Sequence, residues 1–364
     1  MSFNTLSRFT NLIDLNALPV EWWKDVIDLG VKIADNPEQY ARACEGRIMA
    51  ALFYEPSTRT QLSFQAAMKR LGGAVIGFDN PETSSVAKGE VLKDTAKVVS
   101  GYSDIMVMRH NMDGSAKAAA LSADCPIINA GDGGHLHPTQ TLTDLLTLRK
   151  EKGRIKNLVI GICGDLKYGR TVHSLCKALA CFEGTRFVFI STPELSIPAY
   201  IKSIINEKGC PYKEADSIEA VIGELDMLYM TRIQKERFPS AKEYESQIDV
   251  FILDAEKMKK AKSDLCVLHP LPRVDEITYE VDNDPRAKYF KQATYGMYAR
   301  MALIIRILEN RHPAVLLAGK TYDGVNCPNE NCITQKECYL PKSFVDRGGF
   351  LECEYCERTA AKPG

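Results

Sequence analysis

Four consecutive hydrogen-bonding residues interrupt an apolar stretch early in the chain, and their types suit an anion. Residues 51–64 read ALFYEPSTRTQLSF, in which the apolar run is followed by Ser57, Thr58, Arg59 and Thr60. If a helix begins near Thr58, its first turn presents unpaired backbone N–H groups at the positive end of the helix dipole. The hydroxyls add donors, and the planar guanidinium of Arg59 matches phosphate or carboxylate. The pattern favours a phosphate cradle without a P-loop; the alternative is a Ser-capped helix with a solvated arginine.

Comparable polar groups follow other apolar runs of the chain. They lie in MVMRHNMDG (Arg109), INAGDGGHLHPTQTLTDLL (His137, Thr139, Gln140), GDLKYGRTVHSL (Lys167, Arg170), YMTRIQKER (Arg232, Gln234) and VLHPLPRVDEI. The carboxyl ends of parallel strands meet at one edge of a sheet, where open α/β folds bind their ligands. We therefore expect a cleft for a small polyanionic substrate.

The elements that must position these groups alternate between strands and helices. The expected strands are RIMAALFY, AVIGF, DIMVMR, PIINA, LVIGIC, FVFIS, DMLYM and CVLHP, and apolar residues recur at helical spacing in 64–71, 92–99 and 142–149. This order predicts parallel sheets with helices on both faces. We expect two doubly wound α/β domains, 1–149 and 150–292, with helix 293–310 packing back on the first, and a small Cys-rich β domain over 320–364.

Composition excludes some function classes. A chain of 364 residues exceeds what one hydrophobic core usually serves, which agrees with several domains. The formal net charge of −1 favours neither nucleic acid nor an anionic membrane as partner. The start of the chain lacks the features of a signal peptide, and no uncharged apolar stretch approaches a membrane span. We expect a cytoplasmic protein with no membrane and no nucleic-acid partner.

Five of the twelve cysteines crowd into residues 327–356, which indicates a metal site. Four residues separate Cys327 from Cys332, and two separate Cys353 from Cys356. Four thiolates at such spacing suit a closed, tetrahedral and therefore structural Zn²⁺ site. Disulfides are the alternative, which a cytoplasmic location disfavours. We expect Cys338 to remain unliganded.

Six motifs together resemble the catalytic chain of the aspartate carbamoyltransferase family, in order over residues 1–310. They are FYEPSTRTQLSF, VMRH, NAGDG with HPTQTLTDL, GDLKYGRTVHSL, YMTRIQKER and HPLPRVDEI. The resemblance implies transfer of the carbamoyl group of carbamoyl phosphate to the amine of L-aspartate, an early step of pyrimidine synthesis. No side chain looks like a dedicated nucleophile, so we expect direct attack by the substrate amine, with no metal or organic cofactor in the chemical step.

The resemblance also implies a role for each motif residue. Phosphate would be held by Ser57, Thr58, Arg59 and Thr60. The carbamoyl carbonyl would be polarised by Arg109, His137 and Thr60, and the carbamoyl amine held by Gln140 and the backbone carbonyls of Leu271 and Pro272. The two carboxylates of aspartate would be held by Arg170, Arg232 and Gln234.

In the family, a loop reaches into the neighbouring subunit's active site. Here it reads ETSSVAKGEVLKDT, so Ser84 and Lys88 would contact carbamoyl phosphate in a neighbour's site, where Lys88 would also contact aspartate. A homotrimer, alone or in a higher assembly, would be the active unit. Some family members carry a Lys pair before the Gly, whereas Ala87 precedes Lys88 here. Glu55 and Arg237 would pair across the two domains.

Two alternatives remain at this point. A sister enzyme acting on ornithine would want acidic or neutral groups for a cationic side chain, and it reads HCLPR where this chain reads HPLPR. A zinc ribbon could instead bind nucleic acid, although the acidic residues of the tail oppose phosphate contact. Through CPNENCIT and CEYCE the tail resembles the zinc domain of the family's regulatory chain, but it is too short to include a nucleotide-binding domain as well. We expect a fused module that strengthens assembly without sensing ATP or CTP.

Overall fold

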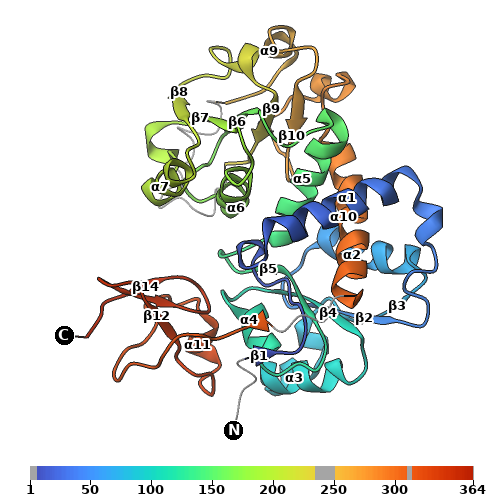
Figure 1. The fold of residues 1–364 in the computed structure, drawn as a ribbon, viewed down its shortest axis with the longest axis vertical. Helices are drawn as coiled ribbons and strands as arrows, with labels where there is room; N and C mark the ends of the chain where they lie inside the picture. Colours follow the sequence, from blue (N-terminus) through green and yellow to red (C-terminus); the bar gives the residue numbers. More distant parts are fainter. Residues whose placement is uncertain (1–5, 234–250, 310–313, 364) are drawn as a thin grey trace. The chain divides into compact units, whose positions relative to one another are not determined.

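The computed structural model describes residues 6–233, 251–309 and 314–363. The chain divides into two compact units, Met1–Thr139 with Met297–Gly364, and Gln140–Gly296. Each unit is built on a parallel sheet, and a small antiparallel sheet lies near the C-terminus (Figure 1). The predicted fold class is confirmed.

The first unit contains a four-stranded parallel sheet in the order β3-β2-β4-β5. Its strands are β2 (Ile48–Phe53), β3 (Ala74–Phe78), β4 (Ile105–His110) and β5 (Ile127–Asp132). Its helices are α1 (Val20–Asp35), α2 (Thr58–Arg70), α3 (Leu92–Ser100) and α4 (Ser115–Ala120). Strands β4 and β5 are buried along their whole length, as expected where helices cover both faces of a sheet.

The second unit contains a five-stranded parallel sheet in the order β10-β9-β6-β7-β8. Its strands are β6 (Val159–Cys163), β7 (Arg186–Ile190), β8 (Tyr212–Ala215), β9 (Met227–Met230) and β10 (Cys266–Leu268), and its helices are α6 (Arg170–Leu179), α7 (Ala199–Glu207) and α9 (Ala255–Lys259). Helices α5 (Pro138–Lys152) and α10 (Tyr289–Glu309) contribute residues to both units. Strand β8 was not predicted, because its sequence YKEA is polar and it lies at the edge of the sheet.

The C-terminal module, residues 314–363, is small and shares its core with the first unit. It contains helix α11 (Ile333–Lys336) and an antiparallel sheet of β12 (Phe344–Asp346), β13 (Leu351–Cys353) and β14 (Thr359–Ala360). A further ribbon pairs β1 (Leu6–Ser7) with β11 (Ala314–Val315). One hydrophobic cluster combines Met106 and Met108 of β4 with Ile333, Phe344 and Tyr355 of the module. The module is therefore packed on the first unit by apolar burial.

Within the described part of the chain, no helix is long and apolar enough to cross a membrane.

Candidate active site and metal centre

The start of α2 is an open helix N-terminus at the carboxyl end of β2. Ser57 is the N-cap residue, but its side chain makes no capping hydrogen bond, and the first turn contains no acidic residue. The positive end of the helix dipole is thus not neutralised from within the helix. Thr60 is buried, whereas Arg59 is exposed. The predicted helix start is confirmed, and the polar residues of its first turn suit an anion; their binding of phosphate stays a prediction.

Arg109 joins two further predicted site residues at the carboxyl ends of the neighbouring strands. It is the fifth residue of β4, and its buried guanidinium lies 3.3 Å from Glu55 Oε2 through Nη2. Its Nη1 atom lies 3.4 Å from His137 Nε2 and donates to the carbonyl of Ala130 at 3.4 Å. Because a guanidinium only donates, His137 Nε2 accepts in this arrangement and the ring proton lies on Nδ1, 3.5 Å from Thr139 Oγ1. The structure therefore brings Glu55, Arg109 and His137 together.

Gly131 leaves room for the side chains of Arg109 and His137, because it has no Cβ. It lies in β5 with φ +124°, and a Cβ there would be 3.0 Å from Arg109 Nη1 and 3.5 Å from His137 Cδ2. Sequence reasoning missed this residue. The available signal was the glycine of NAGDG directly after an apolar run.

The guanidinium groups of Arg59 and Arg109 repel each other when no anion lies between them. Partial desolvation of the guanidinium and, next to it, the charge of Arg109 hold the pKa of Arg59 below its usual value. A guanidinium whose pKa is lowered by a neighbouring positive charge gains from a bound phosphate that neutralises that charge. The electrostatics therefore agree with the anion site that the sequence predicted.

The segment that carries Ser84 and Lys88 lies between β3 and α3. It forms two 3₁₀ turns, Pro81–Thr83 and Ser85–Lys88. Ser84 caps the second turn, since its Oγ accepts from the N–H of Val86 at 3.3 Å and donates to the carbonyl of Pro81 at 2.7 Å. Lys88 is exposed. Their use by a neighbouring subunit stays a prediction.

The residues predicted to hold aspartate lie in the second unit. Arg170 is the first residue of α6 and is half-buried. Arg232 lines a hollow of about 30 Å³ together with Gly164, at the end of β6, and Glu276. Gln234 and Arg237 lie outside the described residues, so the predicted pairing of Glu55 with Arg237 is not tested.

Gln140 is held by a buried carboxylate that sequence reasoning missed. Asp144 is fully buried, and its Oδ1 accepts from Gln140 Nε2 at 2.8 Å and from Gln292 Nε2 at 2.6 Å. The hydroxyl of Tyr229 donates to the other oxygen at 3.0 Å. Burial and the Asp144 carboxylate raise the pKa of Tyr229, which therefore remains a donor. The i, i+4 spacing of Gln140 and Asp144 on one helix was the signal available.

The HPLPR segment is held by a buried hydrogen bond between a histidine and a carboxylate. His269 Nε2 lies 2.7 Å from Glu276 Oε1, and its Nδ1 accepts from the backbone N–H of Leu271 at 2.8 Å. Burial alone would raise the pKa of Glu276, but the contact with His269 and the hydrogen bonds from backbone N–H groups together lower that pKa. Leu271 has φ +56° and precedes a cis proline. The backbone carbonyls predicted to contact substrate thus lie in a turn that His269 holds by a hydrogen bond to the N–H of Leu271.

The four predicted metal ligands meet in the C-terminal module. The Sγ atoms of Cys327, Cys332, Cys353 and Cys356 all lie within 4.8 Å of one another, and all four residues are buried. Two separations are 3.4 Å (Cys327 to Cys356) and 3.9 Å (Cys332 to Cys353). A tetrahedral Zn–S bond of ~2.3 Å requires sulfur atoms about 3.8 Å apart, so the set fits such an ion.

A hydrogen bond supports one of these sulfur atoms. The hydroxyl of Thr334 donates to Cys332 Sγ at 3.2 Å. None of the twelve cysteines forms a disulfide, and Cys338 is exposed and outside the cluster.

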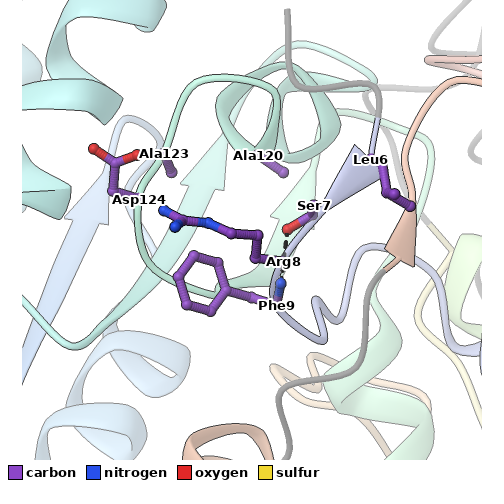
Figure 2. A pocket seen from close by; sticks show the side chains of 7 residues that line it. All are labelled: Leu6, Ser7, Arg8, Phe9, Ala120, Ala123 and Asp124. Atoms are coloured by element: carbon purple, nitrogen blue, oxygen red, sulfur yellow. Dashed lines mark hydrogen bonds between the residues drawn. The ribbon is translucent and has the colours of Figure 1, made fainter.

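A hollow of the first unit lies apart from the candidate anion site at the start of α2. It has a volume of about 150 Å³ and is lined by Leu6, Ser7, Arg8, Phe9, Ala120, Ala123 and Asp124 (Figure 2). Ala123 and Asp124 precede β5, so the hollow lies at the amino end of that strand. Ligand sites of open parallel sheets lie at the opposite, carboxyl ends.

Family models match all three parts of the chain. The aspartate/ornithine carbamoyltransferase carbamoyl-P binding domain matches residues 10–150, and the Asp/Orn binding domain of the same family matches residues 156–307. The metal binding domain of the aspartate carbamoyltransferase regulatory chain matches residues 320–363. The chain belongs to the aspartate/ornithine carbamoyltransferase family.

Similar proteins lie on the aspartate side of that family. The aspartate carbamoyltransferase catalytic subunit of Clostridium novyi is 58% identical over 298 residues, which are 82% of this chain and 97% of that protein. The catalytic subunit of M. jannaschii aspartate transcarbamoylase superimposes with a TM-score of 0.78 at 46% identity, over 82% of this chain and 98% of that one. The Trypanosoma cruzi enzyme in complex with N-(phosphonacetyl)-L-aspartic acid gives 0.76 at 38% identity, over 82% and 95%. The resemblance stated from the motifs is confirmed.

Proposed function

We propose that this chain transfers the carbamoyl group of carbamoyl phosphate to the amine of L-aspartate, giving N-carbamoyl-L-aspartate and phosphate for pyrimidine synthesis. The observation that carries the proposal is the trio of Glu55, Arg109 and His137 beside the open N-terminus of α2. It is an anion site with a donor group next to it, in a chain whose relatives are aspartate carbamoyltransferases. The predicted domain limits, 1–149, 150–292 and 320–364, are part of this proposal.

The phosphate of carbamoyl phosphate is bound by the first unit. The N–H groups at the start of α2, with Ser57, Thr58, Arg59 and Thr60, hold the phosphate. Arg109, His137 and Thr60 polarise the carbamoyl carbonyl, on whose oxygen negative charge develops as the carbon becomes tetrahedral. Because Asp144 engages the amide nitrogen of Gln140, the carbonyl Oε1 of Gln140 is the end that accepts from the carbamoyl NH₂. The carbonyls of Leu271 and Pro272 accept from the same group.

Aspartate is held by Arg170, Arg232 and Gln234, since a dicarboxylate requires two cationic partners. Its neutral amine attacks the carbamoyl carbon, a C–N bond forms, and the C–O bond to phosphate breaks. The departing phosphate takes the amine proton. The chain supplies positioning and preorganised positive charge, with no covalent intermediate.

Assembly and metal complete the proposal. Ser84 and Lys88 act in the site of a neighbouring copy, and the active unit is a cytoplasmic homotrimer. Exposed apolar side chains support a covered surface on the first unit, among them Leu62 on α2 (57% exposed) and Ile76 on the edge strand β3 (39%). The four cysteines hold Zn²⁺, which cross-links the module and so contributes directly to its folding.

The test is an assay of the purified chain with carbamoyl phosphate and either aspartate or ornithine, beside a native mass measurement. We expect turnover with aspartate, none with ornithine, and a mass that is a multiple of three chains. Turnover with ornithine alone, or with neither acceptor, would contradict the proposed reaction. A stable, active monomer would contradict the shared site.

A further inference from the structure

The amino end of α3 is capped by residues far along the chain. Its N-cap residue, Val91, makes no side-chain hydrogen bond, and an apolar side chain cannot make one. Instead, the N–H of Leu92 donates to Glu337 Oε1 at 3.3 Å, and the N–H of Lys93 donates to the hydroxyl oxygen of Tyr339 at 2.9 Å. Two N–H groups that the helix leaves unpaired are thus satisfied by the C-terminal module.

The capping side chains lie in a packed environment. Glu337 is 7% exposed, and Tyr339 packs on the hydrophobic cluster that the module shares with the first unit. Tyr54 and Phe78 pack on the same cluster, with their rings 5.1 Å apart. Tyr54 lies three residues before Ser57, the first residue of the phosphate cradle. Phe78 ends β3, and the segment 79–91 follows it. The module therefore contacts the same cluster as both ends of that segment.

The segment is also tied to α3 within the first unit. The hydroxyl of Thr95 donates to Glu90 Oε2 at 2.7 Å, and Glu90 follows Lys88 by two residues. The remaining segment is largely exposed, so its course depends on where its two ends are fixed. One end is β3, a strand of the sheet, and the other is the start of α3.

We propose that Glu337 and Tyr339 are positioning residues, which fix the start of α3 and thereby aim the segment that carries Ser84 and Lys88. The inference rests on the proposed function, in which that segment serves a neighbouring copy. Neither residue touches a substrate; each acts through the backbone of Leu92 or Lys93.

The metal site fixes the two positioning residues in turn. Helix α11 begins at its N-cap Cys332, a predicted ligand, and the N–H of Glu337 donates to the carbonyl of Ile333 at 2.9 Å. Glu337 and Tyr339 follow this single turn directly. Loss of the metal should therefore also release the caps of α3, which amide hydrogen exchange at Leu92 and Lys93 reads without any activity measurement.

Mixed assemblies of two inactive chains separate this role from a general loss of structure. An Arg59→Ala chain retains an intact segment 79–91, and a Lys88→Ala chain retains an intact cradle. In a mixed assembly, a shared site regains activity where the intact cradle of a Lys88→Ala chain meets the intact segment of an Arg59→Ala chain. Tyr339→Phe is then added to either the Arg59→Ala chain or the Lys88→Ala chain.

We expect Tyr339→Phe to lower the regained activity about fivefold when it is in the Arg59→Ala chain, an effect of about one hydrogen bond, and to leave it within twofold in the Lys88→Ala chain. Glu337→Ala should behave in the same way, and Glu337→Gln, which keeps an acceptor oxygen, should restore most of the activity. Tyr322→Phe and Glu352→Gln, elsewhere in the module, serve as matched controls. Metal content and melting temperature of each variant show that it folds.

If Tyr339→Phe lowers the regained activity equally in either chain, or in neither, the inference is wrong. The proposal of a shared active site would still stand. If the Arg59→Ala and Lys88→Ala chains regain no activity when mixed without any change at Tyr339, the proposal of an active site shared between subunits is wrong. The inference about Glu337 and Tyr339 then fails with it. Unchanged exchange at Leu92 and Lys93 in Tyr339→Phe would show that the hydroxyl does not hold α3.

Discussion

Replacing Gly131 by alanine should disturb the site without removing any of its polar groups. The new Cβ would lie 3.0 Å from Arg109 Nη1, closer than ordinary van der Waals contact, so the guanidinium must move by a few tenths of an ångström. The backbone at φ +124° is also strained for any residue with a side chain, at a cost of ~1–3 kcal/mol.

The magnitude follows from the size of the displacement. A misplacement of about 1 Å in a catalytic arrangement costs roughly 100-fold, so a shift of a few tenths should lower kcat/KM about tenfold. Removing the donor altogether, in Arg109→Ala, should cost more, about 100- to 1000-fold. We therefore expect Arg109→Ala to lower kcat/KM more than Gly131→Ala does.

The assay is steady-state kinetics with carbamoyl phosphate as the varied substrate, together with thermal denaturation. Gly209→Ala is the matched control, because Gly209 also has positive φ, +70°, but a Cβ there meets nothing within 4 Å. It should lose some stability and retain full activity. If Gly131→Ala keeps kcat/KM within twofold of the unmodified chain, the argument that Gly131 makes room for Arg109 and His137 is wrong.

Three further predictions concern other parts of the molecule. Arg232→Ala should weaken aspartate binding about 10- to 100-fold, the loss of one charge-assisted hydrogen bond, and leave carbamoyl phosphate binding nearly unchanged; equal loss for both ligands in equilibrium binding would refute the role of Arg232. Burial lowers the pKa of His110 to about 4, so between pH 6.5 and 4 the unfolded chain binds a proton that the folded chain does not. Stability should fall by up to ~3 kcal/mol over that window and stay level above it. Denaturation curves should show this slope lost in His110→Asn; the same slope in the variant would contradict the assignment. Chelation of the metal should lower the melting temperature and loosen the assembly, and unchanged sedimentation after verified metal loss would exclude a structural metal.

The sequence by itself determined the features that depend on neighbours along the chain. Alternating apolar runs and helical spacing predicted every strand of the first unit's parallel sheet. Strands buried on both faces are rich in apolar residues, as β2 and β4 are, and the partly exposed edge strand β3 is apolar in sequence as well. The start of α2 and its polar residues were predicted because N-terminal helix signals are local. The four cysteine ligands were predicted because knuckle spacing is short.

Only the tertiary structure decided contacts between residues far apart in sequence. Strand β8 was missed because its polar sequence gives no local signal at a sheet edge. The pairing of Arg109 with Glu55, the space that Gly131 leaves and the contact of Asp144 with Gln292 depend on how strands and helices pack. The caps of α3 join residues 245 and 246 positions apart. No periodicity along the chain encodes such contacts, since they arise when separate elements bury their apolar faces together.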